Sequence, residues 1–109
     1  MDNKSKPIII FTSTNSLIEA RKLARILVEK KIVACAQISE IESYYFWERK
    51  VLNEPEFRIL FKTTKNKYKD VEKVLHKLHS YELPVIYSLN IDDIYNPFSK
   101  WIFDNSAGI

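Results

Sequence analysis

One uninterrupted stretch, residues 32–47 (IVACAQISEIESYYFW), most constrains how this chain can fold. It contains neither glycine nor proline and is rich in β-branched and aromatic residues, which predicts one long β-strand. Strands in globular proteins usually have about five or six residues, so this one must extend beyond a small sheet. The overhang would leave backbone donors and acceptors unpaired, and proteins remove that liability by covering or pairing the edge. The stretch therefore predicts pairing with the sheet of another subunit.

Four aromatic residues in a row end this stretch. Tyr44, Tyr45, Phe46 and Trp47 make up more than a quarter of the fourteen aromatic residues in the chain. Because successive side chains of a strand point to opposite faces, two of these rings must face away from any one core. They are either a platform for nucleic-acid bases or an interface with another copy of the chain. We expect an interface, since Tyr and Trp combine apolar area with a polar tip.

Length and composition indicate one ordinary domain. The chain has 109 residues, 46% of them hydrophobic, and we expect a disordered tail over residues 1–6 and a single domain over residues 7–109. Cys35 is the only cysteine, so no intrachain disulfide can form, and a reducing compartment is predicted. The apolar run at residues 8–11 is too short for a signal peptide or a membrane span. We therefore expect a cytoplasmic protein without a membrane partner.

The segments around the long strand have recognisable periods. Residues 8–11 (IIIF) predict a central strand buried on both faces. Apolar residues spaced by three and four predict helices over residues 17–31, capped by Asn15 or Ser16, and over residues 67–80, capped by Asn66. Residues 56–64 alternate as a half-buried strand, which residues 48–55 join to the long strand as a turn. Residues 83–91 predict a last strand, and residues 97–105 a final helix with Pro97 in its first turn.

The order of elements is therefore β-α-β-β-α-β followed by a helix. Right-handed βαβ units in this order predict an α+β, ferredoxin-like fold, with a four-stranded antiparallel sheet and helices on one face. The other face of the sheet would be bare. A bare face that carries aromatic side chains needs a partner.

Three kinds of site are alternatives to assembly. Residues 56–64 (EFRILFKTT) lack the glycine and aromatic alternation of an RNA-recognition strand, so no nucleic-acid partner is predicted. His76, His79, Cys35 and Glu82 do not have the paired spacing of a closed zinc site, although a weaker site shared between subunits stays open. Cys35 lies between two alanines, a poor setting for a reactive thiolate, and we predict no enzyme.

Five segments, in the same order along the chain, resemble the CutA divalent-cation-tolerance family. They are VEKKIVACAQI, YYFWERK, FKTT, LHSYELPVI and IDDIYNPFSKW, and the resemblance extends from residue 8 to about residue 103. It implies a PII-like homotrimer of ferredoxin-like subunits whose long strands join neighbouring sheets. This implication agrees with the assembly predicted from strand length.

The resemblance also implies particular site residues. It implies a cleft between subunits that includes Lys62, His79, Tyr81 and Glu82. It implies a trimer interface formed by Tyr44, Tyr45, Phe46, Trp47 and Trp101. The copper-ligand positions of bacterial members correspond to Phe11, Leu78 and Val85, none of which can bind copper, so no metal ligand is assigned. Arg49 replaces the glycine usual in the family's hairpin turn.

The resulting functional prediction is a cytoplasmic CutA-like homotrimer implicated in tolerance of, or response to, divalent metal ions such as copper. It has no evident catalysis, and its ligand or metal site lies at the clefts between subunits. Two alternatives stay open: a PII-like signalling module that binds a small anionic ligand, and a protein-anchoring scaffold. No cofactor is assigned, with a divalent metal such as copper kept as an alternative. The predicted partners are further copies of the chain and a small-molecule or metal ligand.

Overall fold

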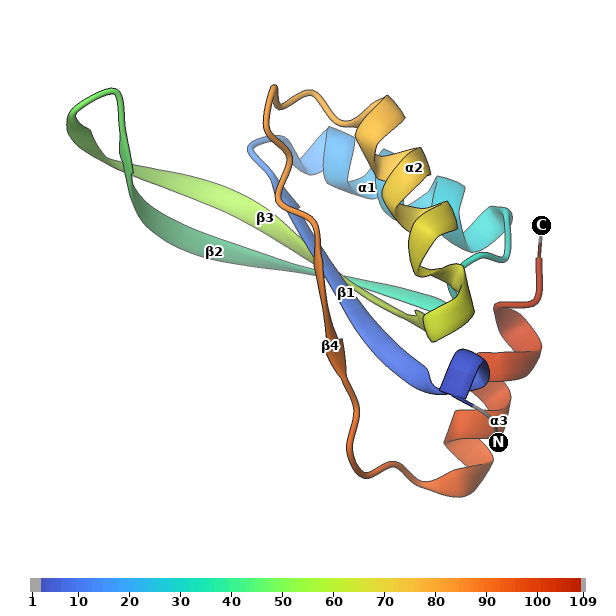
Figure 1. The fold of residues 1–109 in the computed structure, drawn as a ribbon. Coiled ribbons are helices and arrows are strands. Elements are labelled where there is room, and N and C mark those ends of the chain that lie inside the picture. The colour runs from blue at the N-terminus through green and yellow to red at the C-terminus, as the bar shows by residue number, and fades with distance from the viewer. Residues whose placement is uncertain (1–2, 109) are drawn as a thin grey trace.

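The computed structural model describes residues 3–108 as one antiparallel sheet with helices (Figure 1). The strands are β1 (Pro7–Thr14), β2 (Cys35–Trp47), β3 (Lys50–Thr64) and β4 (Tyr87–Asn90). The helices are α1 (Leu17–Glu29), α2 (Tyr68–Leu78) and α3 (Asn96–Asn105), with short 3-10 turns at Asn3–Ser5 and Lys65–Lys67. The strand order is β2-β3-β1-β4, and every pair is antiparallel. The predicted ferredoxin-like fold is confirmed.

Helices α1 and α2 cover one face of the sheet and form the core with it (Figure 1). Ile8 and Ile10 of β1 and Ile59 and Phe61 of β3 point into this core, together with side chains of both helices. The opposite face of the sheet, which we call the open face, carries Ile9 and Phe11 of β1, and these two side chains are only half-buried. β1 is central, as predicted, but the prediction that it is buried on both faces is wrong because α1 and α2 lie on the same side.

Both long helices are shorter than predicted, and only one has the predicted cap. The Ser16 side chain accepts a hydrogen bond from the Glu19 backbone N–H at 3.2 Å and caps α1. The helix ends at Glu29, because Lys31 has a φ of 57°. Asn66 does not cap α2. Its side-chain oxygen accepts from Thr64 at 2.5 Å within the 3-10 turn that precedes the helix.

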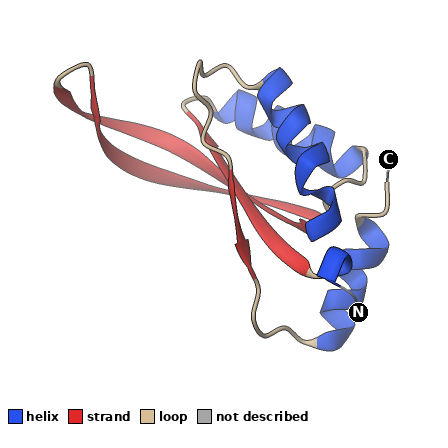
Figure 2. Ribbon diagram, in the orientation of Figure 1, coloured by secondary structure: helices blue, strands red, loops and turns tan. Residues whose placement is uncertain are grey.

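β2 and β3 form a long hairpin that projects beyond the helix layer (Figure 2). Its turn is only Glu48 and Arg49, with φ of 47° and 67°, so the predicted eight-residue turn at residues 48–55 is wrong. Residues 50–55 instead continue β3. β1 ends at Thr14, opposite Phe57, so Pro55 lies where β3 has a neighbour on one side only. A missing N–H is tolerated there. The hairpin makes the molecule elongated, 46 Å in its longest dimension.

The last strand, which the sequence predicts over residues 83–91, is shorter in the structure. β4 has only four residues, because residues 79–86 leave the sheet as an irregular segment. Of the predicted disordered tail, residues 1 and 2 lie outside the described residues, as does residue 109 of the predicted domain. Asn3–Ser5 form a 3-10 turn, and the carbonyl of Lys6 accepts from the Lys65 N–H at 2.9 Å. Pro97 lies in the first turn of α3, as predicted.

The hairpin turn generates a stability prediction. Both turn residues adopt left-handed backbone angles, which cost a residue with a Cβ about 1–2 kcal/mol and cost glycine nothing. Arg49→Gly is therefore expected to raise the free energy of unfolding by about 0.5–1 kcal/mol in urea denaturation at a fixed protein concentration. The matched control is Lys50→Gly. Lys50 lies in the extended strand β3, so this substitution should lower the free energy of unfolding by about the same amount. A lower stability for Arg49→Gly would contradict the proposed strain.

Candidate functional site

A groove lies between the β2–β3 hairpin and residues 79–86, and we call it the hairpin groove. Its volume is about 580 Å³, within the range of sites that bind small molecules. Four aromatic residues line it: Tyr44, Tyr45, Trp47 and Tyr81. The other lining residues are the aliphatic Leu52, Leu83 and Val85 and the polar Ser43, Glu56 and Glu82. The groove therefore combines a largely apolar wall with a few polar groups.

Hydrogen bonds to one carboxylate join the two walls of the groove. The Tyr81 hydroxyl donates to Oε2 of Glu56 at 2.6 Å, and the Ser43 hydroxyl donates to Oε1 at 2.7 Å. Glu56 belongs to β3, Ser43 to β2, and Tyr81 to the irregular segment. Beside them, the Tyr45 hydroxyl donates to Glu54. Glu56 therefore holds the irregular segment against the hairpin.

His79 holds Tyr81 in place from behind the groove. Its side chain is fully buried. Nδ1 accepts from the Tyr81 backbone N–H at 3.0 Å, so the ring proton must be on Nε2, which donates to the Ser13 carbonyl at 2.8 Å. The two rings are also in contact, with centroids 4.8 Å apart. Both ring nitrogens are thus used within the chain, and His79 acts on the groove only through Tyr81.

Glu19, at the start of α1, anchors the same segment. It accepts hydrogen bonds from the Ser80 hydroxyl at 2.6 Å, from the Ser80 N–H at 2.8 Å and from the Thr14 hydroxyl at 2.5 Å. Burial raises the pKa of Glu19. The hydrogen bonds from Ser80 and Thr14 outweigh burial and lower this pKa below its ordinary value of 4.5. The ionised carboxylate therefore stabilises the position of the segment.

Two carboxylates, Glu54 and Glu56, contribute to raising the pKa values of two phenols in the groove wall. Burial, the hydrogen bond to Glu56 and the charges of Glu56 and Glu54 raise the pKa of Tyr81 strongly. The hydrogen bond to Glu54 is the largest cause that raises the pKa of Tyr45, followed by burial and the same two charges. Both phenols therefore stay protonated and can donate hydrogen bonds.

The structure brings together only part of the predicted cleft. Tyr81 and Glu82 line the groove, and His79 lies behind it. Lys62 is elsewhere: its Nζ lies 5.4 Å from the ring centroid of Phe98. It is six residues from Glu56 along β3, a separation of about 20 Å in an extended strand. One chain therefore does not place Lys62 in the groove.

The predicted interface residues divide into three groups. Tyr44, Tyr45 and Trp47 line the groove, whereas Phe46 lies outside it with 70% of its surface exposed. Trp101 stacks on Phe98 in α3, with ring centroids 5.7 Å apart and planes inclined by 8°. All five predicted residues are exposed in the single chain.

Within the described part of a single chain, the donor groups do not form a metal site. Over residues 3–108, no three His, Cys, Asp or Glu side chains gather closely enough to hold a metal ion. Of the positions that correspond to copper ligands in bacterial members, Phe11 contacts Tyr87, Leu78 packs on the core and Val85 lines the groove. The residues present therefore do not fit a metal ion at these places.

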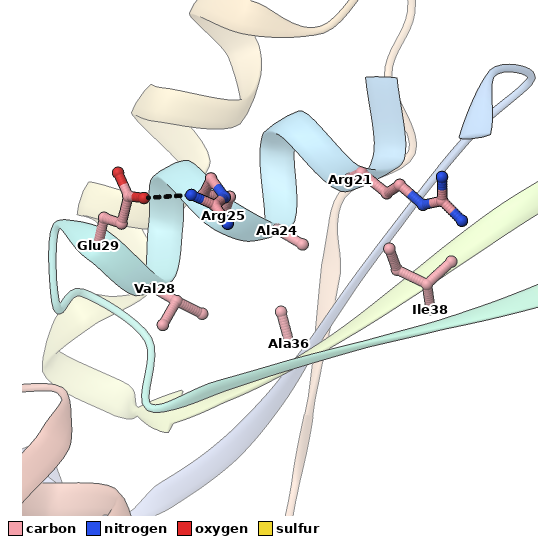
Figure 3. A pocket seen from close by; sticks show the side chains of 7 residues that line it. All are labelled: Arg21, Ala24, Arg25, Val28, Glu29, Ala36 and Ile38. Carbon is pink, nitrogen blue, oxygen red and sulfur yellow. Dashed lines mark hydrogen bonds and ion pairs between the residues drawn. The ribbon is translucent and has the colours of Figure 1, made fainter. Parts of the chain in front are cut away.

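A second hollow of about 600 Å³ lies between α1 and β2 (Figure 3). It is lined by Arg21, Ala24, Arg25, Val28, Glu29, Ala36 and Ile38. The small side chains Ala24 and Ala36 face each other across it, and Arg25 turns towards Glu29 at 3.4 Å (Figure 3). Its three charged side chains are all exposed, so none is held in place by burial to orient a ligand. The hairpin groove is the better candidate site.

The sequence interpretation missed Glu19 and Glu56. Glu19 follows the capping residue Ser16 by three positions, a capping-box spacing that does predict a role at the start of the helix. No local pattern predicts its bonds to Ser80, 61 residues away, or the bond from Tyr81 to Glu56, 25 residues away. These contacts depend on the fold.

The fold and the groove define a class: ferredoxin-like α+β proteins with a projecting hairpin. Within that class, the chain belongs to the CutA1 divalent ion tolerance protein family, whose model matches residues 8–105. In the described part of the chain, no helix is long and apolar enough to cross a membrane.

Individual relatives show the same likeness. The divalent-cation tolerance protein CutA of Thermococcus kodakarensis is 33% identical, over 87% of this chain and 91% of its own. The crystal structure of CutA1 from Shewanella sp. SIB1 is 31% identical with a TM-score of 0.90, covering 94% of this chain and 97% of its own. The structure of the periplasmic CutA from Archaeoglobus fulgidus is 33% identical with a TM-score of 0.89, covering 92% and 98%.

The Glu19 anchor generates a prediction that depends on pH. Glu19→Gln is expected to lower the free energy of unfolding by about 1–2 kcal/mol at neutral pH, because charged hydrogen bonds become neutral ones. The pKa of Glu19 is lower in the folded state, so its carboxylate stabilises the fold above about pH 4.5 and loses this effect as the pH falls through the folded-state pKa. The difference from wild type should therefore shrink in urea denaturation as the pH falls to about 3.

The control for this experiment is an exposed glutamate on the same helix. Glu29 pairs with Arg25 at the surface, and Glu29→Gln should change the free energy of unfolding by less than about 0.5 kcal/mol. If Glu19→Gln matched this control at neutral pH, Glu19 would not be an anchor of residues 79–86.

Proposed function

We propose that this protein acts in the tolerance of divalent cations, copper among them, as a non-catalytic homotrimer in the cytoplasm. The observation that carries the proposal is the family match, which covers residues 8–105 and therefore nearly the whole chain. The relatives from Thermococcus kodakarensis and Thermotoga maritima bear the name divalent-cation tolerance protein. The single cysteine supports a location in the reducing cytoplasm. The Archaeoglobus relative is described as periplasmic, so cell fractionation is needed to distinguish the two compartments.

The exposed apolar surface of the single chain supports assembly. Tyr44 and Phe46 are 68% and 70% exposed near the tip of the hairpin. On the open face, Tyr87 and Leu89 of β4 are about half exposed beside Phe11 and Ile9. β2 and β4 are the edge strands of the sheet and can pair with further strands. A surface of this kind is typical of a subunit interface, and the number of three subunits follows from the resemblance to the family.

The cleft between subunits is proposed to contain the hairpin groove. Tyr81 and Glu82 line it, His79 positions Tyr81, and the aromatic residues of the hairpin form its other wall. Lys62 lies on the open face beside Phe98, and in the trimer it belongs to the surface on which a neighbouring subunit packs. Trp101, stacked on Phe98, is proposed to join the same interface.

Assembly is tested by native mass spectrometry of the metal-free protein. We expect a trimer mass for the wild type. Phe46→Asp should yield monomers, because a charge in an apolar interface must be desolvated. Ile18→Asp is the matched control: Ile18 is 81% exposed on α1, away from the sheet, and the trimer should persist. A monomeric wild type would contradict the proposed assembly.

The role in metal tolerance is tested by growth. A host that lacks its own family member should show impaired growth on a copper(II) series, and this protein should restore it. Phe46→Asp should fail to restore growth, whereas Ile18→Asp should succeed at equal expression. If the wild-type trimer is expressed and growth does not recover, the proposed role in copper tolerance is wrong.

A further inference from the structure

The hairpin groove has a charge that restricts its ligand. Among the described residues that line it, none is Lys, Arg or His, whereas Glu56 and Glu82 both contribute carboxylates. Glu54 adds a third carboxylate behind Tyr45 and accepts a hydrogen bond from the Tyr45 hydroxyl. An anion in this space would be repelled by like charges with few donors to offset the repulsion. The groove therefore favours a cation or a neutral molecule.

The groove also places aromatic rings beside a cation. Tyr45, Trp47 and Tyr81 are among its lining residues, and a cation held over the face of such a ring gains about 0.5–2 kcal/mol. Leu52, Leu83 and Val85 complete the apolar part of the wall. The volume of about 580 Å³ is far larger than a bare ion needs and suits a molecule with an apolar body.

We propose that the hairpin groove binds a small organic ammonium ion that carries an apolar or aromatic body. The charge lies near Glu56 and Glu82, and the body lies against the rings and aliphatic side chains. The inference rests on the proposed function in taking this groove as the ligand site, and it adds the chemical class of the ligand.

A metal ion fits the same residues less well. Only two of the lining side chains are carboxylates, and over residues 3–108 no cluster of three donors exists. Both oxygens of Glu56 already accept hydrogen bonds from Ser43 and Tyr81, which hold the walls together. Each carboxylate oxygen has a further lone pair, so an ammonium group can approach Glu56 without breaking these bonds.

Three probes with one shared phenethyl body test the charge preference. Phenethylammonium is cationic, 2-phenylethanol is neutral and 3-phenylpropanoate is anionic. In titration calorimetry with the wild-type protein as it assembles, phenethylammonium should bind at least about tenfold more tightly than 2-phenylethanol. The anion should bind more weakly still. Equal binding of the cation and the alcohol, preference for the anion, or no binding of any probe would each overturn the proposal.

The two tryptophans report where the probe binds. Trp47 lines the groove, whereas Trp101 lies in α3. In NMR spectra, the indole N–H signal of Trp47 therefore reports binding in the groove, and that of Trp101 is an internal control. Trp101→Phe assigns the two signals. Phenethylammonium should shift the Trp47 signal and leave the Trp101 signal in place. A shift of the Trp101 signal alone would place the ligand elsewhere and overturn the proposal.

Two substitutions separate the roles of charge and rings. Glu56→Gln keeps the side-chain shape and one oxygen that accepts from Tyr81 or Ser43, and should lower the ratio of the affinities for phenethylammonium and 2-phenylethanol about tenfold, because a change in the shape of the groove acts on both probes. Trp47→Leu keeps an apolar wall and should narrow the preference for the cation over the alcohol. Glu29→Gln, on α1 outside the groove, is the matched charge control and should change the affinity for neither phenethylammonium nor 2-phenylethanol. Equal effects of Glu56→Gln and Glu29→Gln would overturn the proposal.

A neighbouring subunit could fill the groove with its own cation, and this alternative has its own result. Lys62→Met should leave the affinity for phenethylammonium unchanged. A tenfold gain in that variant, or binding only by the monomeric Phe46→Asp variant, would show that the chain itself occupies the groove, and would overturn the proposal. The growth assay is independent of these titrations, so failure of the ligand class is distinguishable from failure of the proposed role in metal tolerance.

Discussion

The antiparallel ladder between β2 and β3 is the constraint on which the rest of the structure depends. It is continuous from Cys35 opposite Lys62 to Trp47 opposite Lys50. β1 pairs only with the part of β3 from Phe57 to Thr64, so the remainder of the hairpin has no further neighbour in the sheet. A two-stranded ribbon is marginally stable alone in water. The projecting half therefore depends on what packs against it, which in the single chain is the segment of residues 79–86.

The first three residues of that segment are held by polar contacts, whereas Ile86 at its end packs against the apolar core. At its start, Ser80 bonds to Glu19 and the buried His79 bonds to Ser13 and Tyr81. Further along, Tyr81 reaches Glu56 on the hairpin. Removing one partner of such a network leaves the others unsatisfied, at a cost of about 1–3 kcal/mol each when they are buried. The groove walls are therefore coupled to the first turn of α1, although that turn does not line the groove.

The sequence predicted the order of elements because the periods are strong and local. The long strand lacks glycine and proline, and the helices have clear apolar stripes. The hairpin turn was placed wrongly because Glu48 and Arg49 are not the Asn-Gly or Asp-Gly pair that marks a two-residue turn. The last strand was predicted over residues 83–91 and is present, but β4 contains only Tyr87–Asn90, because residues 79–86 run along the hairpin instead of pairing in the sheet. Such features arise from contacts between distant segments.

The side chains that meet a ligand in the groove also depend on the fold and could not be predicted from local sequence patterns. The family resemblance groups Lys62, His79, Tyr81 and Glu82, which are a cation, an imidazole, a phenol and an acid, as a set that suits an anionic or metal-bearing ligand. The fold separates them: Lys62 lies over Phe98, His79 turns both nitrogens inward, and the groove keeps only Tyr81 and Glu82. The formal charge of +3 gives no guidance either, because exposed charges are screened beyond about 8–10 Å at physiological salt. What a ligand meets in the groove is the local charge of Glu54, Glu56 and Glu82 beside aromatic side chains, in a chain whose total charge is positive.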